Sequence, residues 1–183
     1  KQVPAQCSCK AANVIASLDL GTRVPGAAPT HDLLELGLGR SWKLTGLKLA
    51  GEVRAEEFEE LLGTTLAADV LRKLYCYIQH QHREEELEAL DLSTLSEYTL
   101  LSHLELEGNV DGQLSSFQNH AQLQKLILAD TQVSGSLSFL QNLTQLQMLY
   151  LADTQVSGSL SFLQNLTELQ ELSLSDTQVR GSL

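Results

Sequence analysis

The sequence lacks the features that mark several common classes of protein. No apolar run approaches the roughly 18 residues needed to span a bilayer, so the sequence predicts no transmembrane segment. Three cysteines in 183 residues are too few for a disulfide-dense miniprotein. Lysine and arginine number 12 against 23 aspartate and glutamate residues, and this acidic net charge of −11 disfavours nucleic acid as a partner. Apolar content of 43% is sufficient for a sizeable core, which excludes wholesale disorder.

Motifs of enzyme active sites are also missing. The sequence contains no Gly-x-Ser-x-Gly elbow, no phosphate-binding loop and no dinucleotide-binding fingerprint. The carboxylates are mostly scattered, and we interpret Glu84-Glu85-Glu86 as a solvated charge run. We therefore expect the chain not to be an enzyme, and the sequence predicts no cofactor.

Leucine, by contrast, is abundant. It supplies 39 of the 183 residues, which is about twice its usual share. The segment LQKLILADTQVSGSLSFLQNLTQ from Leu123 is followed by LQMLYLADTQVSGSLSFLQNLTE from Leu146, so the period is 23 residues. A further, incomplete copy begins at Leu169, and a copy that is one residue shorter begins at Leu101. Four copies in register therefore fill residues 101–183, the last of them incomplete.

Each copy follows the pattern Leu-x-x-Leu-x-Leu-x-x-(Asn/Thr)-x-Val-x-Gly-x-Leu. This pattern resembles the leucine-rich repeat family, and its Val-x-Gly-x-Leu portion is similar to the plant-type subclass. The sequence departs from the family at the asparagine position, which holds Asn109 in the first copy and threonine in the later ones (Thr131, Thr154, Thr177). The resemblance implies an α/β solenoid with one short parallel strand per repeat.

The alternation within one copy predicts which side chains form the core. The strand that contains Leu126 and Leu128 should send both leucines inward and leave Lys125, Ile127 and Ala129 outward. No unit can bury its apolar face alone, so stacked neighbours must build a continuous core. The remaining inward positions of this copy are Val133, Leu137, Leu140, Leu143 and Leu146.

Two other residue types recur with the repeat. We interpret the repeated glycines as turn residues that need permissive backbone angles. These glycines are Gly112, Gly135, Gly158 and Gly181. Three phenylalanines are assigned to one repeat position and are expected to stack as a spine along the back of the solenoid: Phe117, Phe139 and Phe162.

Residues 1–100 are less regular, although the strand signature persists. An apolar stripe at helical spacing predicts a helical insertion over about 55–81, broken near 63–65. We interpret 1–100 as an irregular capping region with degenerate repeats, because terminal repeats are usually atypical. The alternative is a small separate α/β domain packed on the repeats. The degenerate signatures are Ile15-x-x-Leu18-x-Leu20, Leu33-x-x-Leu36-x-Leu38, Leu44-x-x-Leu47-x-Leu49 and Leu87-x-x-Leu90-x-Leu92.

The two ends of the sequence carry expectations of their own. Because the chain begins with Lys1 rather than methionine, we expect it to be processed or to be a fragment. A solenoid that is left open at Leu183 would expose core leucines. We therefore expect that the natural chain continues, or that this edge meets another protein.

The cysteines favour two different interpretations. Cys7-x-Cys9 is similar to the cysteine caps of secreted leucine-rich-repeat ectodomains, and this resemblance implies a disulfide between one of the two and Cys76. Free thiols in a reducing compartment are the alternative. Together with His80 the three cysteines would make a three-Cys, one-His zinc set. Their spacing matches no strong zinc signature, so we favour solvated histidines at His80 and His82 and predict no metal.

Two Asn-Leu-Thr sequons, at Asn142 and Asn165, mark possible glycosylation sites. They occupy one repeat position, so duplication alone also explains the pair. Glycosylation is limited to secreted or lumenal chains. The sequons and the Cys7-x-Cys9 pair therefore favour an extracellular or lumenal location.

The outward side of the strands is the strongest candidate for a functional surface. If the repeat register holds, three columns of side chains cross it, and the near-identical copies differ mainly there. The columns are His103, Lys125, Met148 and Glu171; Glu105, Ile127, Tyr150 and Ser173; and Glu107, Ala129, Ala152 and Ser175. Ile127, Met148 and Tyr150 give an apolar centre typical of protein anchors. A flanking acidic ladder favours a partner with a basic patch. The ladder consists of Asp130, Asp153 and Asp176.

These observations predict a non-enzymatic protein-interaction or scaffold module that binds through its concave strand face. Such a module would belong to a larger assembly or a receptor ectodomain, in keeping with what the family usually does. One alternative is a structural assembly subunit with no dedicated ligand, in which duplication and drift alone vary the columns. The other is an ice- or surface-binding protein that uses the threonine array Thr131, Thr154 and Thr177.

Overall fold

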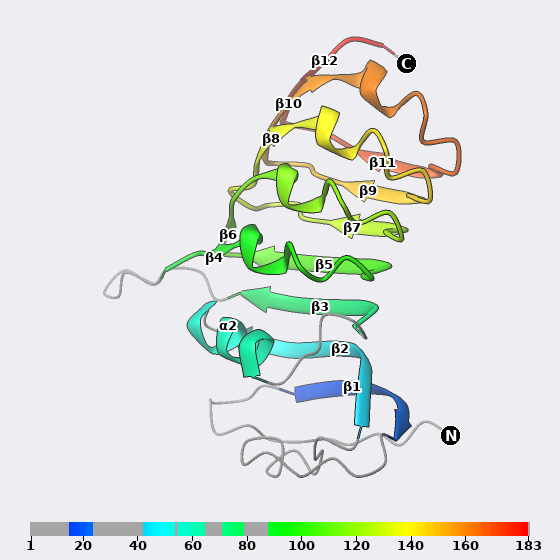
Figure 1. The fold of residues 1–183 in the computed structure, drawn as a ribbon. Helices are drawn as coiled ribbons and strands as arrows, with labels where there is room; N and C mark the ends of the chain where they lie inside the picture. Colours follow the sequence, from blue (N-terminus) through cyan, green and yellow to red (C-terminus); the bar gives the residue numbers. More distant parts are fainter. Residues whose placement is uncertain (1–14, 24–41, 54, 65–70, 79–87, 183) are drawn as a thin grey trace.

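The computed structural model describes residues 15–23, 42–53, 55–64, 71–78 and 88–182, which form a stack of coils. Figure 1 shows the stack rising from the amino-terminal strands at the bottom to the carboxyl terminus at the top. The main sheet consists of β1 (Ile15–Arg23), β2 (Trp42–Val53), β3 (Lys73–Ile78), β5 (His103–Gly108), β7 (Lys125–Ile127), β9 (Met148–Tyr150) and β11 (Glu171–Ser173). The remaining elements are helix α2 (Ala55–Thr64), strands β4 (Leu90–Asp91), β6 (Val110–Asp111), β8 (Ser134–Ser136), β10 (Gln155–Ser159) and β12 (Gln178–Arg180), and the short 3-10 helices η1 (Leu92–Leu95), η2 (Leu114–Phe117), η3 (Leu137–Leu140) and η4 (Leu160–Leu163).

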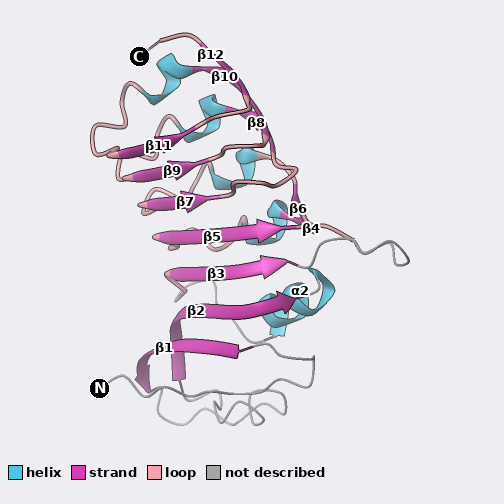
Figure 2. Ribbon diagram, turned by 180° about the vertical axis from the view of Figure 1, so that it is seen from behind, coloured by secondary structure: helices cyan, strands magenta, loops and turns pink. Residues whose placement is uncertain are grey.

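Seven strands form the main sheet, in the order β1-β2-β3-β5-β7-β9-β11. Strands β2 to β11 pair in parallel, as the repeats predict, whereas β1 pairs antiparallel with β2. Figure 2 shows the main sheet along one side of the stack and the strands β8, β10 and β12, which form a second parallel sheet, at another edge. A parallel solenoid therefore runs from β2 to the end of the described residues.

The core lies between the main sheet and the line of 3-10 helices. The alternation predicted for the strand at 125–127 is confirmed, because Leu126 and Leu128 are fully buried while Lys125 and Ile127 remain half-buried. The further inward positions are buried as well: Val133, Leu137, Leu140, Leu143 and Leu146. Each coil thus covers the leucines of its neighbours, which is how a repeat protein builds one core from many small units.

The repeated glycines have positive φ, as the predicted need for permissive backbone angles requires, but Gly135 and Gly158 lie within the short strands β8 and β10 and not in turns. Their φ values are +106° at Gly112, +108° at Gly135, +112° at Gly158 and +99° at Gly181. A Cβ atom on Gly112 would lie 2.9 Å from the backbone nitrogen of Leu92 in the preceding coil. Glycine is therefore required there both by the backbone angle and by the close approach of two coils.

The predicted helical insertion is only partly correct. Residues 55–64 form α2, which buries Phe58 and Leu62 and ends at the expected break. Residues 73–78, however, form strand β3, which pairs with β5 along its whole length. Apolar residues at 71, 74 and 78 fit a helical period, and those at 74 and 78 also fit the period of a strand. The alternation of buried with less buried residues across β3 is that of a strand. Residues 65–70 and 79–81 lie outside the described part of the chain.

The strand signatures of the amino-terminal half had mixed outcomes. The signatures at 15–20 and 44–49 lie in β1 and β2. The signature at 87–92 is wrong, because Leu90 lies in the two-residue strand β4 on another sheet and Leu92 begins η1. The signature at 33–38 lies outside the described residues. The main sheet runs across residue 100, since β3 pairs with β5, and the division into 1–100 and 101–183 stays a prediction.

The phenylalanine spine is also wrong. Phe117 is fully buried at the end of η2, where the next coil has Leu140 at the end of η3. Phe139 and Phe162 sit one position earlier in their helices and are only half-buried. The copy from Leu101 is one residue shorter than the others, and this shifts its phenylalanine by one place.

Helix α2 is held against the stack by packing and by one hydrogen bond. The buried Tyr98 hydroxyl donates to the backbone carbonyl of Leu62 in the last turn of α2, at 2.8 Å. The last carbonyls of a helix have no partner within the helix. Tyr98 therefore satisfies one of them and ties the helix to the coil of β4 and η1.

The described end of the stack is more open than its middle. Leu172 of β11 is 37% exposed, whereas Leu149, its partner in β9, is fully buried. No described coil covers β11, and this leaves its leucine in contact with solvent. The expectation that an open end exposes core leucines is confirmed for these residues.

Candidate functional site on the strand face

The outward side of the main sheet, which we call the strand face, carries the predicted columns in the predicted register. The strand pairings give two rows from β5 to β11: His103–Lys125–Met148–Glu171 and Glu105–Ile127–Tyr150–Ser173. In the third column, Glu107 lies within β5. The other three members come just after the carboxyl ends of β7, β9 and β11: Ala129, Ala152 and Ser175. The geometry brings these residues together on one surface, while their role in partner binding stays a prediction.

Two strands outside the regular repeats extend both rows, and sequence reasoning missed them. Lys73 and Tyr75 of β3 pair with His103 and Glu105, and Lys48 of β2 pairs with Tyr75. The helical interpretation of 55–81 hid this part of the surface. The signal was present, because the Leu-x-x-Leu-x-Cys spacing from residue 71 matches the repeat signature with cysteine in place of leucine.

The added strands bring cations together around one aromatic ring. The Lys48 Nζ lies 5.8 Å from the centroid of the Tyr75 ring, and the Lys125 Nζ lies 5.7 Å from it. Both distances are within the roughly 6 Å range of cation–π attraction. Lys125 also forms an ion pair with Glu105 at 2.8 Å, so its side chain is held across β5 toward β3.

His103 lies between two lysines in the first row. Burial lowers the pKa of its imidazole, and the charges of Lys73 and Lys125 lower it further. Its Nδ1 is within 2.9 Å of the Ser102 hydroxyl. The ring is therefore mainly neutral at pH 7 and can exchange hydrogen bonds with a partner without adding a positive charge.

The centre of the strand face is apolar. Ile127, Met148 and Tyr150 are half-buried, so each presents part of its surface to solvent. The Tyr150 hydroxyl donates a hydrogen bond to the Glu171 carboxylate, and this bond is the main cause of the raised pKa of Tyr150. The bond holds the tyrosine ring in one orientation, so the ring would be preorganised for a partner.

The acidic ladder has a backbone role that the sequence did not reveal. Asp130, Asp153 and Asp176 are exposed and have φ values of +56°, +54° and +52°. Aspartate tolerates this left-handed region better than most residues. The turn itself therefore selects for aspartate, and the role of the three carboxylates toward a partner stays a prediction.

The threonine array is buried, which overturns the ice-binding alternative. Thr131 and Thr154 are each 6% exposed, and Thr177 is half-buried. Their hydroxyls donate to the backbone carbonyls three residues earlier, at 2.6 to 2.7 Å. An ice-binding strip needs exposed hydroxyls, whereas these threonine hydroxyls point into the protein.

Asn109 holds the same repeat position in the first copy but bonds differently, because its side-chain amide donates to the Glu88 carbonyl at 3.3 Å.

The predicted glycosylation sites are accessible. Asn142 and Asn165 are exposed and lie just after η3 and η4, and Thr144 and Thr167 of the same sequons are exposed as well. The sequons therefore lie away from the strands, so glycans there would leave the strand face uncovered. Their modification stays a prediction.

The cysteine and histidine predictions are largely outside the described residues. Cys7, Cys9, His80 and His82 lie there, so neither the disulfide nor the zinc set is tested. Among the described residues Cys76 has no disulfide partner. It lies in β3, is 5% exposed, and pairs with the core residue Leu106. Burial raises its pKa to about 12, so it packs as an apolar side chain. Among the described residues no His, Cys, Asp and Glu cluster could hold a metal.

One buried histidine was not anticipated. His120 is fully buried at the position that holds Tyr98 in the preceding coil, and its ring stands edge-on to Phe117 with centroids 5.2 Å apart. Its Nε2 donates to the Leu95 carbonyl at 3.2 Å, while no described residue bonds to Nδ1. Burial lowers its pKa, so the ring is neutral in the folded chain.

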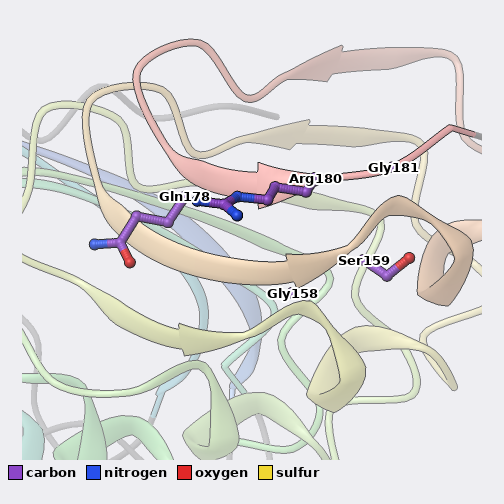
Figure 3. A pocket seen from close by; sticks show the side chains of 5 residues that line it. All are labelled: Gly158, Ser159, Gln178, Arg180 and Gly181. Atoms are coloured by element: carbon purple, nitrogen blue, oxygen red, sulfur yellow. The ribbon is translucent and has the colours of Figure 1, made fainter.

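Away from the strand face, an open hollow lies between the last two strands of the second sheet. Figure 3 shows it lined by Gly158 and Ser159 of β10, by Gln178 and Arg180 of β12, and by Gly181 just after β12. Arg180 is the only charged residue in this lining. The hollow lacks the converging polar groups and apolar walls of a ligand pocket.

The fold has clear counterparts among solved structures. No family model matches the sequence, and no curated protein matches it. The chain is similar to the ectodomain of the Arabidopsis thaliana receptor kinase GASSHO1/SCHENGEN3, solved in complex with CASPARIAN STRIP INTEGRITY FACTOR 2. The TM-score is 0.53, the identity is 24%, and the match covers 86% of this chain and 20% of that one.

Two further structures give the same result. Internalin C2 from Listeria monocytogenes matches with a TM-score of 0.52 and 20% identity over 87% of this chain and 72% of that one. The PEPR1–AtPEP1 structure matches with a TM-score of 0.52 and 21% identity over 75% of this chain and 19% of that one. This chain thus spans about a fifth of GASSHO1/SCHENGEN3 and of PEPR1.

The strand order, the repeat and these matches define the fold. The chain has the leucine-rich-repeat solenoid fold, and its repeats resemble the plant type. Within the described part of the chain, no helix is long and apolar enough to cross a membrane.

Proposed function

We propose that this chain is a non-enzymatic interaction module that binds a protein partner on its strand face. The main support for this proposal is the set of positions at which the repeats differ from one another. Between the copies from Leu123 and Leu146, three of 23 positions differ, and two of them are strand-face positions, 125/148 and 127/150. In the 15 positions of the last copy, four differ from the copy before, and three of these lie on the strand face: 148/171, 150/173 and 152/175.

Drift after duplication does not account for this distribution. Exposed positions off the strand face would drift as freely, yet many are identical between the copies from Leu123 and Leu146. The exposed identical pairs include Gln132/Gln155, Gln141/Gln164, Asn142/Asn165 and Thr144/Thr167. Variation concentrated on the strand face of the last three copies, on a nearly constant frame, is what selection for a partner would produce.

The composition of the strand face supports a protein as the partner. Half-buried Ile127, Met148 and Tyr150 offer an apolar and aromatic anchor. Glu171 and the acidic ladder beside it favour a partner that carries a basic patch. Two of the similar structures hold a bound partner, CASPARIAN STRIP INTEGRITY FACTOR 2 in one and AtPEP1 in the other, which agrees with the proposal.

The proposal is tested by co-purification with matched variants. The double variant Ile127→Asp/Tyr150→Ala alters the centre of the strand face, and Gln132→Ala/Gln155→Ala alters two exposed side chains elsewhere. We expect proteins that co-purify with the wild type from its native source to be lost from the first variant and retained by the second. Equal retention by both variants would contradict binding at the strand face.

A further inference from the structure

The charges on the strand face are divided between its two ends. Five lysine and arginine side chains are described, and four of them lie on or beside β2, β3 and β7: Lys48, Arg72, Lys73 and Lys125. Three described acidic residues accompany them, Glu105 and Glu107 in β5 and Asp130 just after β7. The described side chains at this end therefore carry four positive and three negative charges, in a chain whose net charge is −11.

The opposite end of the strand face carries only negative charges. The described segments 148–153 and 171–176 contain no lysine or arginine. Their acidic residues are Asp153, Glu171 and Asp176. The apolar centre of Ile127, Met148 and Tyr150 lies between the two ends, so the surface is basic, then apolar, then acidic along the sheet.

The basic end also has the geometry of an anion site. Lys48 approaches the Tyr75 ring from the neighbouring strand β2, and Lys125 approaches it from β7 beyond β5. Two ammonium groups that converge on one ring repel each other. Glu105 already pairs with Lys125 at 2.8 Å and relieves part of this repulsion, so a partner's carboxylate would accept charge-assisted hydrogen bonds mainly from Lys48. Lys73, in the adjacent row of β3, adds a further donor.

We propose that the strand face binds a charge-polarised segment of its protein partner. The acidic end of the segment lies among Lys48, Lys73 and Tyr75, its apolar middle lies on Tyr150, and its basic end lies against Glu171. This inference rests on the proposed function and adds the chemistry and the orientation of the ligand. It also refines the expected basic patch, which accounts for only one end of the segment.

The spacing of the charges follows from the sheet. Four strand steps separate β3 from β11, which is about 19 Å at roughly 4.8 Å per step. An extended segment that crosses the strands advances about 3.3 Å per residue. Its acidic and basic residues should therefore be about six positions apart.

The test is a selection of random 12-residue peptides on the full chain, followed by fluorescence anisotropy with the enriched peptides. We expect peptides with Asp or Glu about six positions from Lys or Arg. Versions in which all charges are acidic, or all basic, should bind at least tenfold more weakly. Lys48→Gln/Lys73→Gln should weaken binding at least tenfold and Glu171→Gln about threefold. Arg180→Gln, which removes one positive charge away from the strand face, should change affinity less than twofold.

The outcomes separate this inference from the proposed function. Peptides that lose affinity for Tyr150→Ala but not for Lys48→Gln/Lys73→Gln would overturn the charge-polarised segment and leave strand-face binding intact. Peptides that are insensitive to all three strand-face variants would overturn both. If Arg180→Gln lowers the affinity for the peptides as much as Lys48→Gln/Lys73→Gln does, the net charge of the chain explains the effect and the inference is overturned. A selection that enriches no peptide would also contradict it.

Discussion

Leu149 and Leu172 occupy the same position of two nearly identical repeats, yet Leu149 is fully buried and Leu172 is 37% exposed. The local sequence cannot explain this difference, because both residues lie in a Leu-x-x-Leu-x-Leu signature. The neighbouring coils explain it: Leu149 has a coil on either side, while no described coil covers Leu172. In a solenoid the contribution of a side chain to the free energy of unfolding therefore depends on the coils beside it. Substitutions at pairs of equivalent residues can measure that dependence.

The largest effect is expected from a charge in the middle of the stack. Leu149→Asp places an unpaired carboxylate in the core and should destabilise the repeats by more than about 4 kcal/mol. Leu172→Asp, at the open end, should lower stability by less than about 2 kcal/mol, because its carboxylate can reach water. Thermal melts followed by circular dichroism distinguish the two. A retained cooperative melt for Leu149→Asp would show that the register is wrong.

A smaller difference is expected between two turn glycines. Gly112 and Gly181 both have positive φ, so alanine at either should cost about 1–2 kcal/mol in backbone strain. At Gly112 the new Cβ would also collide with the Leu92 backbone nitrogen at 2.9 Å, whereas at Gly181 the nearest atom is the Ser159 hydroxyl oxygen at 3.3 Å. Urea titrations should therefore give Gly112→Ala the lower midpoint. Equal midpoints would mean that the two coils do not approach closely at Gly112.

The buried threonines provide the next comparison. Thr131→Val removes a hydrogen bond of 2.6 Å and leaves the Leu128 carbonyl without that donor, which should cost about 1–2 kcal/mol. Thr177→Val removes the equivalent bond at a half-buried site, where water can replace it, and should cost less. Chemical denaturation measures both. A larger loss for Thr177→Val would contradict the view that the inner coil has the drier environment.

His120 should make stability depend on pH. Its folded-state pKa is lowered from the ordinary value of 6.5, so the unfolded chain binds more protons than the folded chain as the pH falls through that range. The stability is therefore fully present above about pH 6.5 and is lost as the pH decreases below it, by at most about 1.4 kcal/mol per pH unit for one proton. His120→Leu, which copies Leu143 of the next coil, should flatten this dependence in melts between pH 5 and 8. An unchanged slope would assign the dependence to other groups.

The smallest effect on stability is expected at the strand face. Tyr150→Ala removes a half-buried side chain and its bond to Glu171, and should change the free energy of unfolding by less than about 0.5 kcal/mol. The same change should weaken partner binding. A large loss of stability would place Tyr150 in the core instead.

The sequence predicted the regular coils well because one signature repeats there in register. Strand β3 was missed because residues 71, 74 and 78 fit a helical period, and Cys76 replaces the expected leucine. The phenylalanine spine failed because the copy from Leu101 is one residue short. Both errors arise where local spacing is ambiguous, and only strand pairing or 3-10 helix position resolves it.

The candidate site on the strand face was predicted only where the repeat is regular. The two rows from β5 to β11 follow from the repeat alone, since strand pairing preserves the repeat register. The cations around Tyr75 could not be found in this way, because Lys48 and Lys73 come from strands without a regular spacing. Likewise, the left-handed backbone at Asp130 is a property of the turn, and the burial of Thr131 depends on the neighbouring coils.

The central claim is that a protein partner lies on the strand face, and crosslinking mass spectrometry on the gently purified native complex tests it most directly. Lys73 and Lys125 are the reporters, because they lie in one row of that surface, on either side of His103. The account predicts that partner crosslinks arise from these two lysines. Partner crosslinks confined to other lysines, or a lone chain on size exclusion without crosslinks, would contradict it.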